Sequence, residues 1–124
     1  MTSQRLRIVP SVFVIEHLPN ATFPDDDEWI AMVRAPEGLT LVREVPPFVE
    51  AERWVGYYDA VPSDPSATGQ LASVVGPLAG AGVPVFVAST YHGDLVLVPE
   101  HRVPAATAAL KEAGHRIEEG SGGS

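Results

Sequence analysis

The stretch that decides the fold is TGQLASVVGPLA, at residues 68–79. Its large apolar residues recur at i, i+3, i+4 and i+7, the spacing of one helix face: Leu71, Val74, Val75 and Leu78. The Gly-Ala-Gly run at residues 80–82 follows directly, and glycine commonly ends a helix. We therefore predict an amphipathic helix over residues 68–79 that packs its apolar face against a sheet.

Outward from this helix, short apolar runs predict strands, and the segment after Arg102 predicts a second helix. In chain order we expect strand 54–61, the helix 68–79, strand 83–88, strand 95–98, helix 103–113 and strand 115–118. Pro104 suits the first turn of the second helix, and Gly114 suits its end. The order β-α-β-β-α-β is that of a ferredoxin-like unit, so we predict an α+β fold.

The first half of the chain shows a weaker version of the same pattern. It predicts a strand over 6–18 kinked near Pro10, a hairpin of strands 29–33 and 39–42, and a short helical turn within 48–53. We predict a degenerate N-terminal unit at 1–52, a C-terminal unit at 53–119 and a flexible Gly/Ser tail at 120–124. Units of about 60 residues are too small to bury good cores alone, so the two should pack on one another.

Composition excludes several classes of function. The 124 residues carry 16 acidic side chains, 8 basic ones and no cysteine, for a formal net charge of −8. An acidic chain is a poor match for nucleic-acid phosphates or an anionic membrane surface. The N-terminal apolar stretch is interrupted by Pro10, Glu16 and His17, which argues against a signal peptide, and no run is long enough to span a membrane. We expect a soluble, cytoplasmic protein.

No motif for a metal or cofactor is present. The four histidines are scattered without the spacing of a metal site, and there is no thiolate ligand. The acidic run at residues 25–28 lacks the alternating ligands and glycine turn of a calcium loop, so we interpret it as a solvated loop. No phosphate-binding loop or nucleophile elbow occurs. We therefore predict no metal and no cofactor.

Three segments resemble the CASTOR-like type of ACT domain, found in small bacterial proteins with two tandem ACT-like units. They are the strand start at residues 54–58, the Thr-Gly to Val-Phe segment at 67–86, and the Ser-Thr-Tyr-His-Gly-Asp segment at 89–99. The stretch at 37–42 resembles the first-half hairpin of that type. The resemblance implies a ferredoxin-like ACT fold with two tandem units, and a regulatory module that binds an amino acid between them; CASTOR proteins sense arginine.

Six residues match ligand-contacting positions of this type: Thr68, Gly69, Gln70, Thr90, Tyr91 and Asp94. A helix start at Thr68 would offer free backbone N–H groups to a carboxylate, and Asp94 could accept charge-assisted hydrogen bonds from an ammonium or guanidinium. Plainer interpretations stay open. Thr68-Gly69 could serve only as a helix cap, Gly93-Asp94 only as a hairpin turn, and Tyr91 only as packing.

Three classes of function remain open from the sequence. The first is a non-catalytic, amino-acid-binding sensor. The second is a small ferredoxin-like enzyme, for which His92 and Asp94 are the only candidate pair. The third is a module that recruits another protein through a sheet edge or helix face. The resemblance also allows a homodimer, without deciding it.

Overall fold

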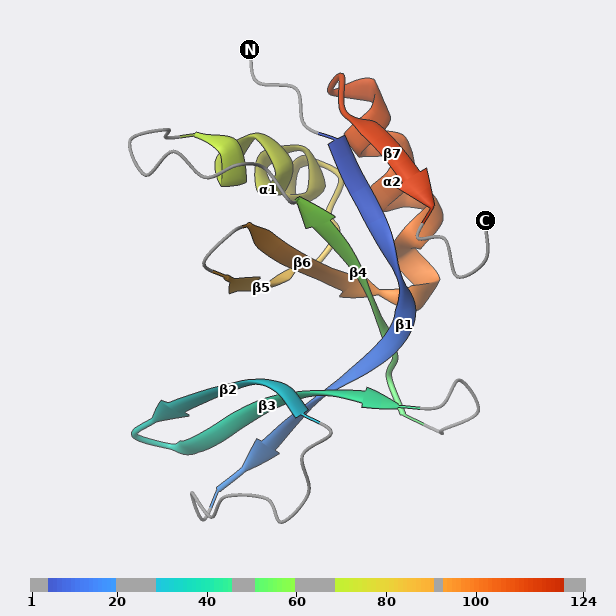
Figure 1. The fold of residues 1–124 in the computed structure, drawn as a ribbon. Coiled ribbons are helices and arrows are strands. Elements are labelled where there is room, and N and C mark those ends of the chain that lie inside the picture. Colours follow the sequence, from blue (N-terminus) through green and yellow to red (C-terminus); the bar gives the residue numbers. More distant parts are fainter. Residues whose placement is uncertain (1–4, 20–28, 46–50, 60–68, 91–92, 120–124) are drawn as a thin grey trace.

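The structure is a computed structural model that describes residues 5–19, 29–45, 51–59, 69–90 and 93–119. Within these ranges the chain forms seven strands, two α-helices and one short 3-10 helix (Figure 1). In chain order they are β1 (Arg5–Leu18), β2 (Trp29–Ala35), β3 (Gly38–Val45), β4 (Trp54–Asp59), α1 (Gln70–Gly80), β5 (Phe86–Ser89), β6 (Asp94–Pro99), η1 (Glu100–Arg102), α2 (Val103–Glu112) and β7 (Arg116–Glu119).

The strands form one sheet in the order β2-β3-β1-β4-β6-β5, with β7 pairing beside β1. β1 pairs with three strands along its length: in parallel with β7 over residues 5–8, and antiparallel with β4 over 7–13 and β3 over 12–18. The β1–β4 register shifts between Ile8 and Val12, on either side of Pro10, which has no N–H to donate to a ladder. The predicted kink near Pro10 is confirmed.

Both helices cover one face of the sheet (Figure 1). Strand residues alternate between faces, and Tyr57, Val96 and Val98 point towards the helices. There they join the other members of the main core, which are Leu6, Val74, Leu78, Val83, Ala106 and Leu110. Val74 and Leu78 are the buried residues of α1, so the predicted apolar face of this helix is confirmed.

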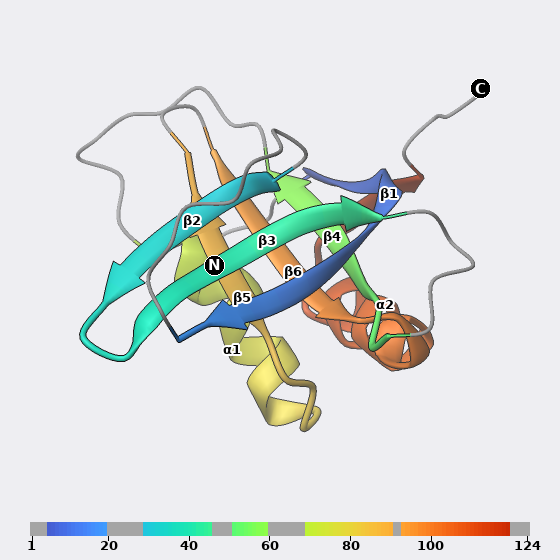
Figure 2. The same cartoon turned by 90° about the horizontal axis from the view of Figure 1, so that it is seen from below.

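The opposite face is covered by the β2–β3 hairpin and the second half of β1. Figure 2 shows these three strands crossing over β4, β6 and β5. Phe13, Val42 and Leu97 are the buried residues of this second, smaller core. Gly56 leaves room for it, because a Cβ there would come 2.8 Å from Leu95 Cδ1 and 3.2 Å from Leu97 Cδ2. The molecule therefore has three layers: helices, the central strands and the hairpin.

The predicted α+β class and the order β-α-β-β-α-β over the second half are confirmed. The sheet, however, joins the two halves more closely than two separate units would. The closing strand β7 pairs with β1 of the N-terminal half, and β1 in turn pairs with β4. The described residues of 1–52 form three strands and no helix. The helical turn predicted within 48–53 falls partly outside the described residues, and 51–53 are not helical.

Candidate ligand-binding site

Two aspartates face each other where β4 ends and β6 begins. Asp59 and Asp94 are register partners across the β4–β6 ladder, and Ser89 of β5 is paired with Asp94 on the other side. Directly opposed residues of an antiparallel pair have Cβ atoms about 4.5–5.5 Å apart on the same face. This is the helix-covered face, because Asp59 lies two residues beyond Tyr57 on the same strand. The three polar side chains thus lie where these strands begin or end, on the face of the sheet that the helices cover.

Asp59 is the least solvated of these side chains. It is only 4 % exposed, and its Oδ1 has no hydrogen-bond partner. Burial raises the pKa of its carboxyl, the charge of Asp94 raises the pKa further, and His115 opposes both effects. A buried carboxylate oxygen without a donor is costly, and such groups are concentrated at functional sites.

His115 completes this polar cluster from the helix layer. It is 4 % exposed and follows α2, just before β7. Its Nε2 lies 2.7 Å from the carbonyl oxygen of Ser73 in α1. Because a carbonyl can only accept, Nε2 carries the proton of this hydrogen bond. This hydrogen bond fixes His115 against α1. From there the charge of the ring acts on Asp59 and lowers the pKa of its carboxyl.

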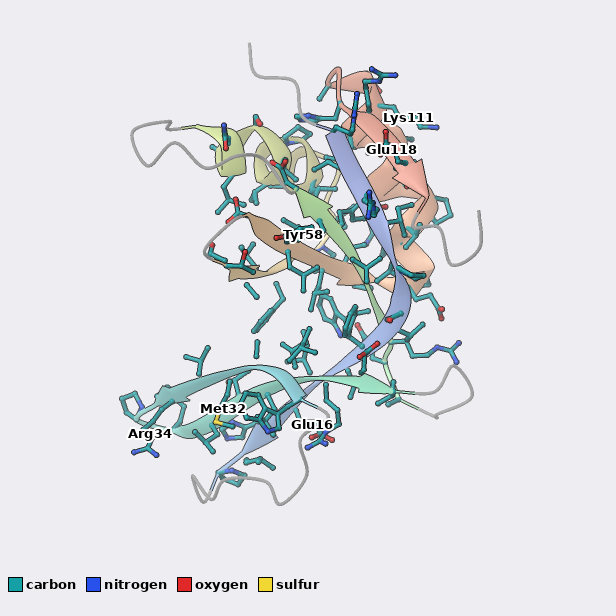
Figure 3. The ribbon with its side chains drawn as sticks, viewed as in Figure 1. Glu16, Met32, Arg34, Tyr58, Lys111 and Glu118 are labelled. Carbon is teal, nitrogen blue, oxygen red and sulfur yellow. The ribbon has the colours of Figure 1, made fainter. Side chains whose placement is uncertain are left out.

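The β5–β6 turn fixes the position of Asp94. Ser89 Oγ donates to Asp94 Oδ1 at 2.8 Å. The Thr90 amide donates to the Gly93 carbonyl at 2.7 Å, and the Gly93 amide donates to Thr90 Oγ1 at 2.9 Å. Tyr58, labelled in Figure 3, brings its hydroxyl 3.4 Å from Thr90 Oγ1. The Thr90 hydroxyl is therefore engaged in holding the turn.

Gly93 is required in this turn by close approach rather than by its backbone angles. A Cβ on Gly93 would collide with the carbonyl oxygen of Asp59 and lie 3.2 Å from the Tyr58 hydroxyl. Only glycine lets the turn pack this closely on the end of β4. The same contact keeps Asp94 opposite Asp59.

The first turn of α1 lies on the same side of the molecule as the β5–β6 turn (Figure 1). The helix begins after Gly69, which has a positive φ of 87° and no side chain with which to cap the helix. No acidic residue occupies the first turn of α1. A Cβ on Gly69 would meet no atom within 4 Å among the described residues other than its chain neighbours.

The structure describes four of the six predicted site residues, in two places on one side of the molecule (Figure 1). Gly69 and Gln70 start α1, while Thr90 and Asp94 flank the β5–β6 turn. Thr68 and Tyr91 lie outside the described residues, as does His92 of the candidate catalytic pair. Their roles in binding stay predictions.

Sequence reasoning missed Asp59 and His115. Asp59 carried a usable signal, because it lies two positions after Tyr57 and so belongs to the same buried strand face. His115 carried none, since nothing in the sequence indicates that the end of α2 brings it beside α1. Its burial depends on packing between the two helices.

Other parts of the described chain offer little to a ligand. A shallow depression of about 390 Å³ lies between the C-terminal ends of α1 and α2, lined by Pro77, Gly80, Ala81, Ala109, Glu112 and Ala113. It is at the opposite end of α1 from Gly69. Within the described ranges no group of three His, Asp or Glu residues has the arrangement of a metal site. None of the helices found there is long and apolar enough to cross a membrane.

Residues 60–112 match the family model of the ACT domain. The segment covers α1, β5, β6 and α2, which include most of the candidate site. The match supports the resemblance to ACT domains drawn from the sequence. ACT domains are generally regulatory modules that bind small molecules.

Two solved structures are similar over nearly the whole chain. The crystal structure of protein Atu0741 from Agobacterium tumefaciens has a TM-score of 0.81 and 25 % sequence identity, over 96 % of this chain and 95 % of that one. VC0802 from Vibrio cholerae, a protein of unknown function described as a possible transport protein, has a TM-score of 0.71 and 25 % identity over 88 % of each chain. A comparison with curated proteins finds no match.

Proposed function

We propose that this protein is a non-catalytic regulatory module that binds an amino acid at the edge formed by the start of α1 and the β5–β6 turn. The observation that carries the proposal is the pairing of Asp94 with the buried, unsatisfied Asp59, on the side of the molecule where α1 starts without a side-chain cap. The match of residues 60–112 to ACT domains supports a small-molecule ligand. An amino acid has the two opposite charges that this arrangement complements.

The carboxylate of the ligand would lie at the start of α1. The first amides of a helix have no intrahelical acceptors, and the helix dipole adds positive potential there. Gly69 lets a ligand approach the backbone closely, and there is no acidic side chain in the first turn to compete. Gln70 begins the helix at the same place and would border the ligand.

The cationic group of the ligand would lie at Asp94. Its carboxylate is only partly buried, and Ser89 holds it in place with a hydrogen bond of 2.8 Å. Hydrogen bonds between a carboxylate and an ammonium or guanidinium are among the stronger ones available to proteins. Thr90 would act by shaping the turn rather than by contacting the ligand with its hydroxyl.

The finer features follow the resemblance to CASTOR-like proteins of bacteria. We propose that residues 1–52 and 53–119 are two ACT-like units and that the protein acts in the cytoplasm. The described residues of the proposed site all belong to the second unit. Sharing of one sheet by β1, β4 and β7 supports an intimate pairing of the two halves. The Thr68 and Tyr91 positions belong to this proposed site by resemblance.

Thermal-shift measurements with the twenty amino acids test the proposal. At about 100 times its dissociation constant, a ligand that binds only the folded state adds about 2.7 kcal/mol of stability. We expect at least one amino acid to raise the melting temperature, and Asp94→Asn to remove that rise. Glu37→Gln is the matched control, since it removes one exposed carboxylate from the β2–β3 turn. The proposal fails if none of the amino acids stabilises the wild-type protein.

A second candidate function, protein recruitment, is favoured by the surface of β2. This strand is at one end of the sheet order and carries the exposed large apolar side chains of the described chain: Trp29, Ile30 and Val33, which are 38 %, 42 % and 54 % exposed. Exposed apolar edge strands pair readily with other strands. We propose a second copy of this chain as the partner, giving a homodimer.

The oligomeric state tests this candidate. Light scattering coupled to gel filtration should give the dimer mass for the wild-type protein and the monomer mass for Val33→Lys, because a charge at an edge strand blocks pairing. Arg34→Lys on the same strand is the control that preserves charge. A monomeric wild-type protein at high concentration would rule out the homodimer.

A further inference from the structure

Asp59 is the one described side chain with a buried polar atom that lacks a hydrogen-bond partner. Folding places it there at a cost, since a buried carboxylate with an empty acceptor site loses its hydration without replacement. The cost would be lower if the carboxyl carried a proton. It would also be lower if a cation occupied the neighbouring site.

Among the described residues, the charged groups around Asp59 come from two directions. β6 presents Asp94 directly opposite it, and the segment before β7 presents His115. α1 contributes no titratable side chain over residues 70–80. On this face β1 contributes the fully buried, apolar Leu6, while its neighbours Arg5 and Arg7 are exposed. Within the described part of the chain, Asp94 is the negative charge that acts on Asp59, and it disfavours ionisation of Asp59.

We propose that Asp59 is a second carboxylate of the Asp94 site, which holds a proton in the ligand-free protein and releases it to solvent when a cationic group binds at Asp94. The negative charge of Asp94, opposite the buried Asp59, makes loss of the Asp59 proton less favourable. A cation on Asp94 offsets the repulsion, so the proton leaves Asp59 as the cation arrives. The charge of the site stays balanced, with one cation gained and one proton lost.

Because of this coupling, the site should bind cationic ligand groups in preference to neutral ones. Its affinity for a cationic group should also rise with pH. The coupling rests on the proposed function in one respect only, which is that the ligand's cation lies at Asp94. Below the pH at which Asp59 ionises in the free protein, the affinity should rise by up to about tenfold per pH unit, the limit for one released proton. A neutral isostere of the ligand gains nothing from ionisation of Asp59.

Carboxyl-carbon NMR of the full chain tests the proposal without a known ligand. We expect the Asp59 carboxyl to titrate above the ordinary range of aspartate in the wild-type protein, and closer to that range in Asp94→Asn. Added n-butylammonium chloride should lower the Asp59 midpoint in the wild-type protein in a saturable way and should have less effect in Asp94→Asn. Glu37→Gln should behave as the wild type. An Asp59 midpoint that neither Asp94→Asn nor n-butylammonium shifts would overturn the proposal.

Binding measurements separate this inference from the proposed function. If an amino acid stabilises the protein, its affinity should depend on pH in the wild type and much less in Asp59→Asn, which keeps Asp94. Equal pH dependence in the two proteins overturns the proton coupling and leaves the amino-acid sensor intact. Conversely, a failure of all amino acids to bind, together with a shift of Asp59 by n-butylammonium, overturns the sensor but retains the cation site.

Discussion

Replacing Gly93 by alanine places a methyl group against the end of β4. The added Cβ would collide with the carbonyl oxygen of Asp59 and would lie 3.2 Å from the Tyr58 hydroxyl. Two other glycines provide the same chemical change in different surroundings. At Gly56 the obstacles are the tips of two leucine side chains, at 2.8 and 3.2 Å, and at Gly80 in α1 no atom beyond its chain neighbours and the helix backbone lies within 4 Å.

The surroundings predict both the sign and the order of the three effects. Alanine is favoured over glycine inside a helix by about 0.5–1 kcal/mol, so Gly80→Ala in the last turn of α1 should stabilise the protein by up to that amount. Overpacking costs about 1–3 kcal/mol, and flexible side chains lower that cost while backbone does not. We therefore expect Gly56→Ala to lose about 1 kcal/mol and Gly93→Ala to lose about 2–3 kcal/mol.

Urea unfolding monitored by circular dichroism measures the three differences. With a slope of about 1–3 kcal/mol per molar urea, typical of small domains, the Gly93→Ala midpoint should fall by about 1–2 M. The reasoning is refuted if Gly93→Ala unfolds at the wild-type midpoint, or if Gly56→Ala is the less stable of the two. Because Gly93 holds Asp94 opposite Asp59, the Gly93 variant should also bring the Asp59 titration closer to ordinary values.

Three further perturbations test the core and the site. Tyr57→Phe should lower the free energy of unfolding by about 1 kcal/mol, because it removes the 2.7 Å hydrogen bond to Thr107 Oγ1 that joins β4 to α2. Adding Thr107→Val to this variant should cause no further loss, since both changes remove the same hydrogen bond. Phe13→Ala should cost about 3–5 kcal/mol, since Phe13 is 3 % exposed in the core below the hairpin; a smaller loss in urea unfolding would show that the hairpin is loosely attached. Asp59→Asn should be more stable than the wild type at about pH 7 and lose that advantage at about pH 4. The raised pKa of Asp59 means that the wild-type protein is stabilised below the ordinary carboxyl pKa and loses that stability as pH rises through the folded-state value. A difference in melting temperature that does not change with pH would contradict this sign.

Much of the second half of the fold could be predicted because its signals are local. The apolar spacing of α1, the glycines that end both helices and the turn at residues 90–94 each depend on neighbours within a few residues. They predicted the observed order of elements to within a few residues at each boundary. The turn also led directly to Asp94.

The candidate site was predicted less completely, because the chemistry of a residue depends on what covers it. The sequence predicts Asp59 only as part of the strand 54–61, and nothing local in that strand marks it as buried. In the folded chain Asp59 is 4 % exposed, Asp94 lies opposite it across the β4–β6 ladder, and His115 acts on it electrostatically. Those contacts bring together segments that are far apart in the sequence.

By itself, then, the sequence determined which residues form helices and strands and which face of each is apolar, since 3.6- and 2-residue periods are properties of a single segment. Only the tertiary structure decided that β1 separates β4 from β7, and that the hairpin covers the second face of the sheet. Each strand pairs with strands that are far away in the sequence. This pairing depends on how the whole sheet buries its two faces, and no periodic pattern within one segment reports it. The same long-range packing placed Asp59 at the end of β4 opposite Asp94 at the start of β6, where we propose the site.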